Sequence, residues 1–190
     1  MRIVAGRHKG RTLLVPEGRT LRPTADRTRE SVFNILAHGI DGFDFEGISV
    51  IDVFAGTGAL GLEAMSRGAA HVTFVDHDHD ALNCARKNAA QVGEWRNATL
   101  LRLDATRLPP PPLAAQAPCP LAFLDPPYGE GLAIPALQGL AAKGWLAKDG
   151  IAVVEIGAKE DLEPPRGYIL LDRRTYGAAQ VLFLKFEGLS

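Results

Sequence analysis

The 190-residue sequence contains only two cysteines, Cys84 and Cys119, and neither belongs to a Cys-x-x-Cys pair. This scarcity excludes a disulfide framework and a zinc site of the usual spacing, and it indicates a reducing, cytoplasmic location. The sequence also lacks an apolar run long enough for a secretory signal or a membrane span, so neither export nor insertion is expected. With 46% hydrophobic and 23% charged residues, the composition predicts an ordinary folded domain.

Charge is nearly balanced overall but is unevenly distributed along the chain. The whole sequence carries −1, whereas residues 1–30 hold eight basic and three acidic side chains, and the remainder is acidic. A basic arm on an acidic body suits contact with a phosphate backbone, although a charged tail that only faces solvent has the same composition. We therefore divide the chain into a basic N-terminal hairpin or arm, residues 1–24, and a main domain, residues 25–190.

The first forty residues predict a hairpin followed by a helix. Two apolar runs within residues 3–15 flank a turn-rich stretch, as in a β-hairpin. Arg22-Pro23-Thr24 is expected to be extended, because proline disfavours helix in the residue before it. Apolar residues then recur at helical spacing, which predicts a helix that is capped by Asp26 and ends at Gly39.

Beyond residue 47, short apolar runs alternate with helical patterns. This alternation predicts parallel strands that are joined by right-handed crossovers and covered on both faces by helices. The last two runs lack a helix between them, so we expect an antiparallel hairpin at the end of the sheet. The fold class is therefore α/β, with a doubly wound, mostly parallel seven-stranded sheet. The expected strands are 48–53, 71–75, 99–103, 121–124, 151–155, 168–171 and 181–186, and the expected helices are 60–67, 81–92 and 132–146.

A G-x-G-x-x-G motif follows the first strand of this pattern, with glycines at 56, 58 and 61. Such glycines let the backbone approach a nucleotide closely. Asp76 comes 20 residues after Gly56, at the end of the next strand, where a carboxylate can bind ribose hydroxyls. On this pattern alone, several nucleotide cofactors fit the loop.

Acids at two further strand ends distinguish between these cofactors. Asp52 stands at the end of the first strand, where a carboxylate is unfavourable for a pyrophosphate. It suits instead a ligand with a positive end, such as the amino group of S-adenosylmethionine. Asp104 follows the third strand, where it could accept a hydrogen bond from an adenine amine. Three acids beside one glycine loop would otherwise be a coincidence.

The run Asp76-His77-Asp78-His79-Asp80 contains good metal ligands in succession. We nevertheless expect no metal site, because the chain becomes helical at Ala81 and the five side chains then diverge. Asp78 is expected to cap that helix, and His79 and Asp80 to lie on its first turn.

The stretch Asp125-Pro126-Pro127-Tyr128 follows the fourth strand, which places it beside the glycine loop. The prolines remove backbone donors, so the stretch presents hydrogen-bond acceptors, and Tyr128 offers a flat face for stacking. If Asp125 and the Pro126 carbonyl each accept one N–H of an exocyclic base amine, its lone pair can be aimed at a sulfonium methyl. Asp125, Pro126 and Tyr128 are therefore the expected catalytic residues.

These motifs resemble the class I S-adenosylmethionine-dependent methyltransferases, and within them the bacterial RsmD family, which methylates guanine N2 in 16S ribosomal RNA. The resemblance covers nearly the whole chain. Besides the glycine loop and Asp125–Tyr128, it is carried by residues 2–6, 22–30, Ser66-Arg67-Gly68-Ala69 and Tyr176-Gly177.

The resemblance implies a Rossmann-like class I fold and gives roles to the residues. The expected cofactor-binding residues are Asp52, Ala55, Gly56, Gly58, Asp76, His77, Asp104 and Ala105. Asp125 and Tyr128 are expected to position a guanine of the guanine-966 type in 16S rRNA of the small ribosomal subunit. Asp76 stands where the family often has glutamate, so its contact with ribose is less direct.

A site that modifies a base favours RNA as the partner of the basic arm. The target base must be unpaired or flipped out of the RNA to reach Asp125, so the surrounding RNA has to be held on the protein. The expected RNA-binding residues are Arg7, Lys9, Arg11, Arg22, Arg27 and Arg29.

Two alternatives remain: a DNA adenine-N6 methyltransferase, because Asp125–Tyr128 suits any exocyclic amine, and a non-catalytic RNA-binding scaffold. Against the first, 190 residues leave no room for a target-recognition domain. We expect a monomer.

Overall fold

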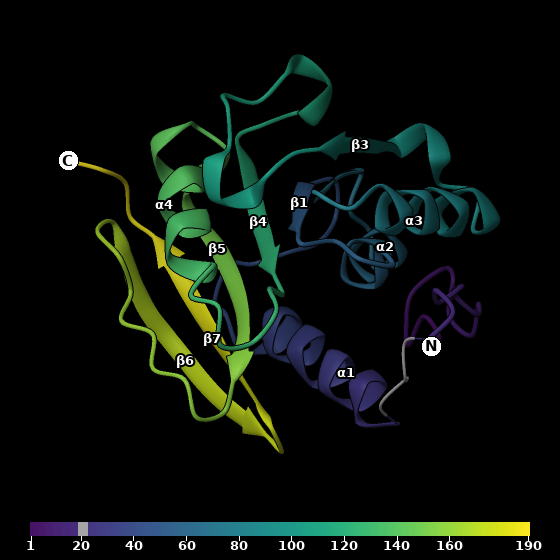
Figure 1. Ribbon diagram of the computed structural model, residues 1–190, viewed down its shortest axis with the longest axis horizontal. Helices are drawn as coiled ribbons and strands as arrows, with labels where there is room; N and C mark the ends of the chain where they lie inside the picture. The colour runs from purple at the N-terminus through teal and green to yellow at the C-terminus, as the bar shows by residue number, and fades with distance from the viewer. Residues whose placement is uncertain (19–22) are drawn as a thin grey trace.

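A computed structural model describes residues 1–18 and 23–190 of the chain. Its centre is a seven-stranded sheet with the strand order β3-β2-β1-β4-β5-β7-β6 (Figure 1). The strands are β1 (Ser49–Val53), β2 (His71–Asp76), β3 (Ala98–Arg102), β4 (Cys119–Leu124), β5 (Leu146–Gly157), β6 (Tyr168–Tyr176) and β7 (Ala179–Phe186). Strands β1 to β5 pair in parallel, and β7 is antiparallel to both β5 and β6. The doubly wound sheet with an antiparallel C-terminal strand is therefore confirmed.

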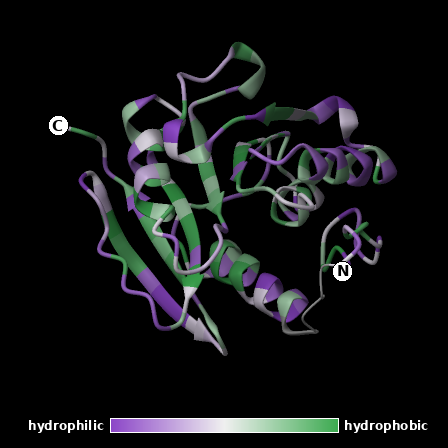
Figure 2. Ribbon diagram, viewed as in Figure 1, coloured by the Kyte–Doolittle hydropathy of each residue, from purple (hydrophilic) through white to green (hydrophobic). Residues whose placement is uncertain are grey.

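Helices cover both faces of the sheet. Buried side chains of α1 (Pro23–His38), α2 (Ala59–Ser66) and α3 (His79–Gln91) form one core cluster with alternate residues of the strands. The opposite face carries a second cluster with α4 (Ala133–Ala142) and Trp145. The apolar colouring of the central strands in Figure 2 follows from this burial on both sides. Three short 3-10 turns, Trp95–Asn97, Ala105–Arg107 and Leu113–Ala115, lie in the connections flanking β3.

The N-terminal predictions need correction in three places. Helix α1 begins at Pro23, so Pro23 and Thr24 are helical rather than extended, and Asp26 lies in the first turn rather than at the cap. Proline is favoured at the first helical position, because its missing N–H has no partner there and its φ is already helical. Residues 3–15 form no regular strands: the hairpin consists of a turn closed by one isolated bridge between Arg2 and Thr12. Arg22 lies outside the described residues.

The predicted helix over residues 132–146 is too long. Helix α4 ends at Ala142, Gly144 adopts a left-handed φ of +82°, and Leu146 already begins β5. The other predicted strands and helices exist, with ends that differ by one to several residues. Within the described residues, no helix combines the length and the apolar character that a membrane crossing requires. The division of the chain at residue 24 remains a prediction.

Candidate active site

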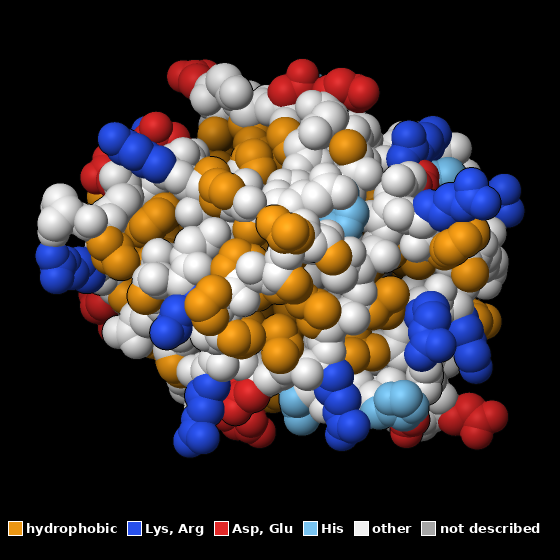
Figure 3. Space-filling model, turned by 90° about the horizontal axis from the view of Figure 1, so that it is seen from above, with side chains coloured by type: hydrophobic (Ala, Val, Ile, Leu, Met, Phe, Trp, Pro, Cys, Tyr) orange, Lys and Arg blue, Asp and Glu red, His pale blue; other side chains and the backbone are white. Residues whose placement is uncertain are grey.

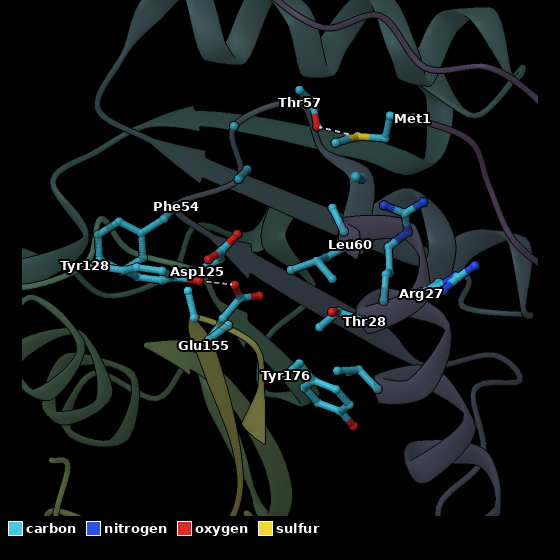
Figure 4. A pocket seen from close by; sticks show the side chains of 18 of the residues that line it. Met1, Arg27, Thr28, Phe54, Thr57, Leu60, Asp125, Tyr128, Glu155 and Tyr176 are labelled. Carbon is cyan, nitrogen blue, oxygen red and sulfur yellow. Dashed lines mark hydrogen bonds between the residues drawn. The ribbon is translucent and has the colours of Figure 1, made fainter. Parts of the chain in front are cut away.

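A cavity of about 860 Å³ opens where β1, β4 and β5 end. Its lining includes the loop after β1 from Phe54 to Thr57, the acids Asp125 and Glu155, and residues of α1. Figure 4 shows Asp125, Tyr128 and Glu155 grouped on one side, with Arg27 and Thr28 of α1 facing them. The cavity therefore lies at the carboxyl edge of the parallel strands, where α/β folds bind their ligands.

The glycine loop has its shape because three positions exclude other side chains. Gly56 and Gly58 have positive φ values of +55° and +80°, which glycine adopts without strain. A Cβ added to Gly61 would lie 2.5 Å from the Phe74 ring, so only glycine lets α2 pack this closely on β2. The loop backbone is thereby turned toward the cavity, which Ala55 and Gly56 line.

Two predicted cofactor-binding acids hold this loop from behind. The buried Asp52 carboxylate accepts the Gly61 N–H at 2.9 Å, and burial raises its pKa, with the charges of Asp125 and Asp76 adding to the effect. Asp76 accepts the Gly56 N–H through Oδ2 at 2.9 Å and the Asp78 N–H through Oδ1 at 2.9 Å. Neither side chain lines the cavity wall, so both position the loop backbone in this structure.

Asp104 continues this row of strand-end acids, since β1, β2 and β3 are neighbours in the sheet. Its Oδ1 accepts hydrogen bonds from the backbone N–H and the hydroxyl of Thr106, and these bonds lower the pKa of its exposed carboxyl. Its neighbour Ala105 is buried, whereas the His77 side chain is 80% exposed. The row therefore consists of one exposed acid, Asp104, and two acids that bind backbone N–H groups, Asp52 and Asp76.

The acids and histidines that follow β2 point in different directions. Asp78 caps α3 by accepting the Asp80 N–H, as predicted, while His79 contacts Asn83 one turn further along the same helix. Among the residues that the structure describes, no group of three potential metal ligands comes together.

Asp125 and Glu155 stand side by side on neighbouring strands. The β4–β5 register pairs Leu124 with Val154, so the residues that follow them, Asp125 and Glu155, lie at the same level of the sheet. Tyr128 donates a hydrogen bond from its hydroxyl to Glu155 Oε1 at 2.5 Å (Figure 4). Sequence reasoning missed Glu155, although it ends the predicted fifth strand and the strand-end rule applied to Asp52, Asp76 and Asp104 would have found it.

The described members of the predicted RNA-binding set lie in four different environments. Arg27 lines the cavity, and Lys9 and Arg11 are exposed. Arg7 forms an ion pair with Glu94 at 2.5 Å. Arg29 is buried between acids, 3.0 Å from Asp26 and 3.7 Å from Glu63. In the face drawn in Figure 3, several basic side chains gather at the right-hand edge, the side on which α3 lies in Figure 1.

This burial gives Arg29 a structural place rather than the surface place that its sequence context predicted. Its guanidinium also donates to the Arg2 carbonyl, so it ties α1 to the start of the chain. Arg29 is therefore not expected to contact RNA. Of the other catalytic predictions, Asp125 and Tyr128 line the cavity, whereas the Pro126 ring is buried beside them.

Known proteins share both the sequence and the fold. The family model described as Conserved hypothetical protein 95 matches residues 1–185. Ribosomal RNA small subunit methyltransferase D of Escherichia coli (strain K12) is 38% identical over 156 residues, which cover 82% of this chain and 74% of that protein. The Haemophilus influenzae protein of the same name is 34% identical over 183 residues, covering 93% and 89%.

The structural comparison agrees with the sequence comparison. The solved structure of Escherichia coli yhhF superposes with a TM-score of 0.80 at 32% identity, covering 100% of this chain and 99% of that chain. The class I methyltransferase fold expected from the sequence is therefore confirmed. Because the family model spans nearly the whole chain and the relatives exceed 30% identity over most of it, this protein belongs to the Conserved hypothetical protein 95 family, the RsmD family that its motifs resemble.

Proposed function

We propose that this protein transfers a methyl group from S-adenosylmethionine to the exocyclic N2 of a guanine in 16S ribosomal RNA. The observation that carries the proposal is the meeting of Asp125 and Tyr128 with the glycine loop around one cavity. The relatives named for methylation of small-subunit ribosomal RNA support the substrate class. A guanine-966-type target in the small subunit, a cytoplasmic location and a monomeric state belong to the same proposal.

The residues at the sheet edge suit S-adenosylmethionine. The cofactor offers donors along its length, namely an amino group, ribose hydroxyls and an adenine amine, and the chain offers acceptors at Asp52, Asp76 and Asp104. Asp104 is exposed, so its carboxylate can accept from such a donor, and Asp76 keeps lone-pair sites beyond the two N–H groups that it receives. The Gly56 backbone, which lines the cavity, lets a ligand approach. Asp52 acts through the loop that it holds. When bound, the cofactor supplies an activated methyl group on a sulfonium.

Asp125 performs the decisive step on the base. A guanine amine is planar and a poor nucleophile, because its lone pair is delocalised into the ring. Asp125 and the Pro126 carbonyl each accept one N–H, which turns the lone pair out of the ring plane and fixes its direction. Such orientation contributes up to roughly 7–11 kcal/mol in favourable systems. The Asp125 carboxylate also stabilises the positive charge that develops on nitrogen, and it can take the proton afterwards.

Tyr128 holds the base in place for this step. Its side chain remains 38% exposed at the cavity, and the hydrogen bond to Glu155 fixes its orientation. A ring held in this way gives a purine a surface on which to stack once it has left its own RNA stack. Residues of α1 also line the cavity, and from there Arg27 can contact the neighbouring phosphate.

The experiment incubates the protein and labelled S-adenosylmethionine with small ribosomal subunits lacking their own methylations, with naked 16S RNA and with DNA. Nucleoside analysis then identifies the product. N2-methylguanosine from subunits or RNA is the expected result, whereas N6-methyladenine from DNA would select the rival DNA methyltransferase. Recovery of no methylated nucleoside, with RNA still bound, would favour the non-catalytic scaffold.

The Asp125→Ala variant tests the mechanism. We expect its rate of methylation to fall about 10²–10⁴-fold, because the amine loses both its orientation and its charge partner. Asp125→Asn keeps one acceptor oxygen and should lose less. The matched control is Glu163→Ala, which removes an exposed acid that is not part of the cavity lining. Retention of the full rate by Asp125→Ala would exclude this mechanism.

A further inference from the structure

Glu155 is a cavity-lining carboxylate to which the proposed reaction assigns no contact with the substrate. It lies near the end of β5, a central strand of the sheet, and it is only partly exposed. Because the strand register sets it level with Asp125, two carboxylates face the same cavity from neighbouring parallel strands. Adjacent strands are about 4.8 Å apart, which lets such a pair accept hydrogens from adjacent groups on one base edge.

The surroundings of Glu155 fix its orientation without using all of its acceptor capacity. Its Oε1 receives the Tyr128 hydroxyl at 2.5 Å, and Oε2 has no hydrogen-bond partner among residues 1–18 and 23–190. The Tyr128 ring lies along the same strand, because an ideal Cβ on Gly157 would be 3.6 Å from Tyr128 Cδ2. A carboxylate has about four lone-pair sites, so Glu155 can orient the tyrosine and still accept from a base.

We propose that Glu155 reads the N1–H of guanine and thereby makes this site specific for guanine. The inference rests on the proposed function and deepens it. In guanine, the N2 amine that Asp125 binds is next to N1–H, a donor. A carboxylate beside Asp125 therefore accepts the second donor of the same edge, and Tyr128 stacks on the ring.

The same arrangement rejects adenine. Next to its exocyclic N6 amine, adenine carries an N1 lone pair rather than an N–H. That lone pair would face the Glu155 carboxylate, so the base would lose a charge-assisted hydrogen bond and meet repulsion instead. Sites built to receive a donor discriminate strongly against analogues lacking it, because the buried acceptor is then left unpaired.

The test uses 2-aminopurine, which keeps the exocyclic amine at C2 but has an unprotonated N1. Small subunits are reconstituted from ligated 16S RNA carrying either guanine or 2-aminopurine at the methylated position. We expect the wild-type kcat/KM to favour guanine by about 10–100-fold. In Glu155→Gln this ratio should fall by about tenfold or more, because the glutamine amide can donate to the unprotonated N1.

Tyr128→Phe is the matched control, because it removes the hydroxyl that binds Glu155 while keeping the stacking ring. It should lower the rate on both bases and leave the guanine preference in place. If Glu155→Gln turns over too slowly, competition between the two kinds of subunit for binding provides the same ratio. Melting temperatures establish that each variant is folded.

Two results would overturn the inference: an unchanged preference in Glu155→Gln, or an equal loss of preference in Tyr128→Phe, which would make Glu155 only a support for the tyrosine. Failure of the proposed function is distinguishable from both. In that case the wild-type protein itself would form no N2-methylguanosine on the guanine subunits.

Discussion

At the scale of single residues, His71 is a buried titratable group that forms no ion pair with any described residue. It begins β2 and is 4% exposed. Its Nε2 is 2.9 Å from Thr99 Oγ1, whereas Nδ1 has no hydrogen-bond partner among the described residues. Burial lowers the pKa of this imidazole from its ordinary value of 6.5, because the charged form loses water. The folded protein therefore holds His71 neutral.

This burial predicts a loss of stability in mild acid. Between the unfolded pKa of 6.5 and the lower folded pKa, the unfolded chain binds more protons, so the free energy of unfolding falls as pH falls through that window. Urea denaturation at about pH 7.5 and about pH 5.5 measures the change. In His71→Gln the decrease should be smaller. The raised pKa of Asp52 makes the free energy of unfolding rise as pH falls, but Asp52 is present in both proteins and its effect cancels in the comparison. Equal decreases in the free energy of unfolding of the wild type and His71→Gln would refute the role of His71.

The places of the site acids at strand ends were predictable, but how deeply each acid is buried was not. Asp125 follows β4 directly and reaches the cavity, as expected. Asp52 is the second-last residue of β1, so the alternation of strand side chains turns it toward the face that α2 covers, where it is 1% exposed. The β1–β4 register pairs Asp52 with Phe123, so Asp125 lies on the same face but two residues nearer the cavity, and this offset separates a cavity-lining acid from a buried one. Strand boundaries read from sequence are too uncertain to decide between them.

At the scale of elements, α2 and the first residues of the chain form one structural unit. The fully buried Glu63 carboxylate of α2 accepts the Val4 N–H at 2.9 Å and the Ala5 N–H at 3.0 Å, and it pairs with Arg67 at 3.1 Å. The Ser66 carbonyl accepts the Arg7 N–H, and a Cβ on Gly6 would lie 1.9 Å from that oxygen. The arm is therefore held on the domain rather than extended into solvent.

These contacts explain motifs that the sequence could only match by resemblance. Ser66 and Arg67 are remote from the arm in sequence, so local patterns gave no sign that they anchor it. Asn88 of α3 adds a second link: it is fully buried, receives the Leu14 N–H at 2.7 Å and donates to the Thr57 carbonyl at 2.9 Å. The arm is thus tied to the glycine loop. The parallel strand order, by contrast, followed from local alternation and general rules of connection.

Replacement of Glu63 by glutamine tests this unit. The change preserves the side-chain shape but leaves Arg67 and Arg29 without their buried counter-charge, so we expect the free energy of unfolding to fall by about 3–5 kcal/mol. Limited proteolysis should also cut the arm faster. Glu46→Gln, at an exposed position before β1, is the control and should change little. Unchanged unfolding and proteolysis in Glu63→Gln would show that the contacts contribute no stability.

At the scale of the whole molecule, the basic charge of residues 1–30 is only partly available to a polyanion. Arg7 is paired with Glu94, and Arg29 is enclosed by acids. Burial would raise the pKa of Glu94, but hydrogen bonds from Asn97 and His8 and the charge of Arg7 outweigh it, so its pKa is lowered and the pair stays charged. Lys9 is exposed and makes no ion pair with any described residue.

This difference between two neighbouring cations predicts different contributions to RNA binding. Each phosphate contact releases counterions, so the loss of one contact lowers the slope of log affinity against log salt by about 0.7–0.9. Titrations of small-subunit RNA over a range of salt concentrations should show a reduction of this size for Lys9→Gln. They should show a smaller one for Arg7→Gln, because Glu94 already neutralises much of that charge. Lys148→Gln, an exposed cation on β5, should leave the slope unchanged. Equal slopes for Lys9→Gln and Lys148→Gln would mean that RNA does not dock on the arm, and that the uneven charge along the chain serves only its folding and solvation.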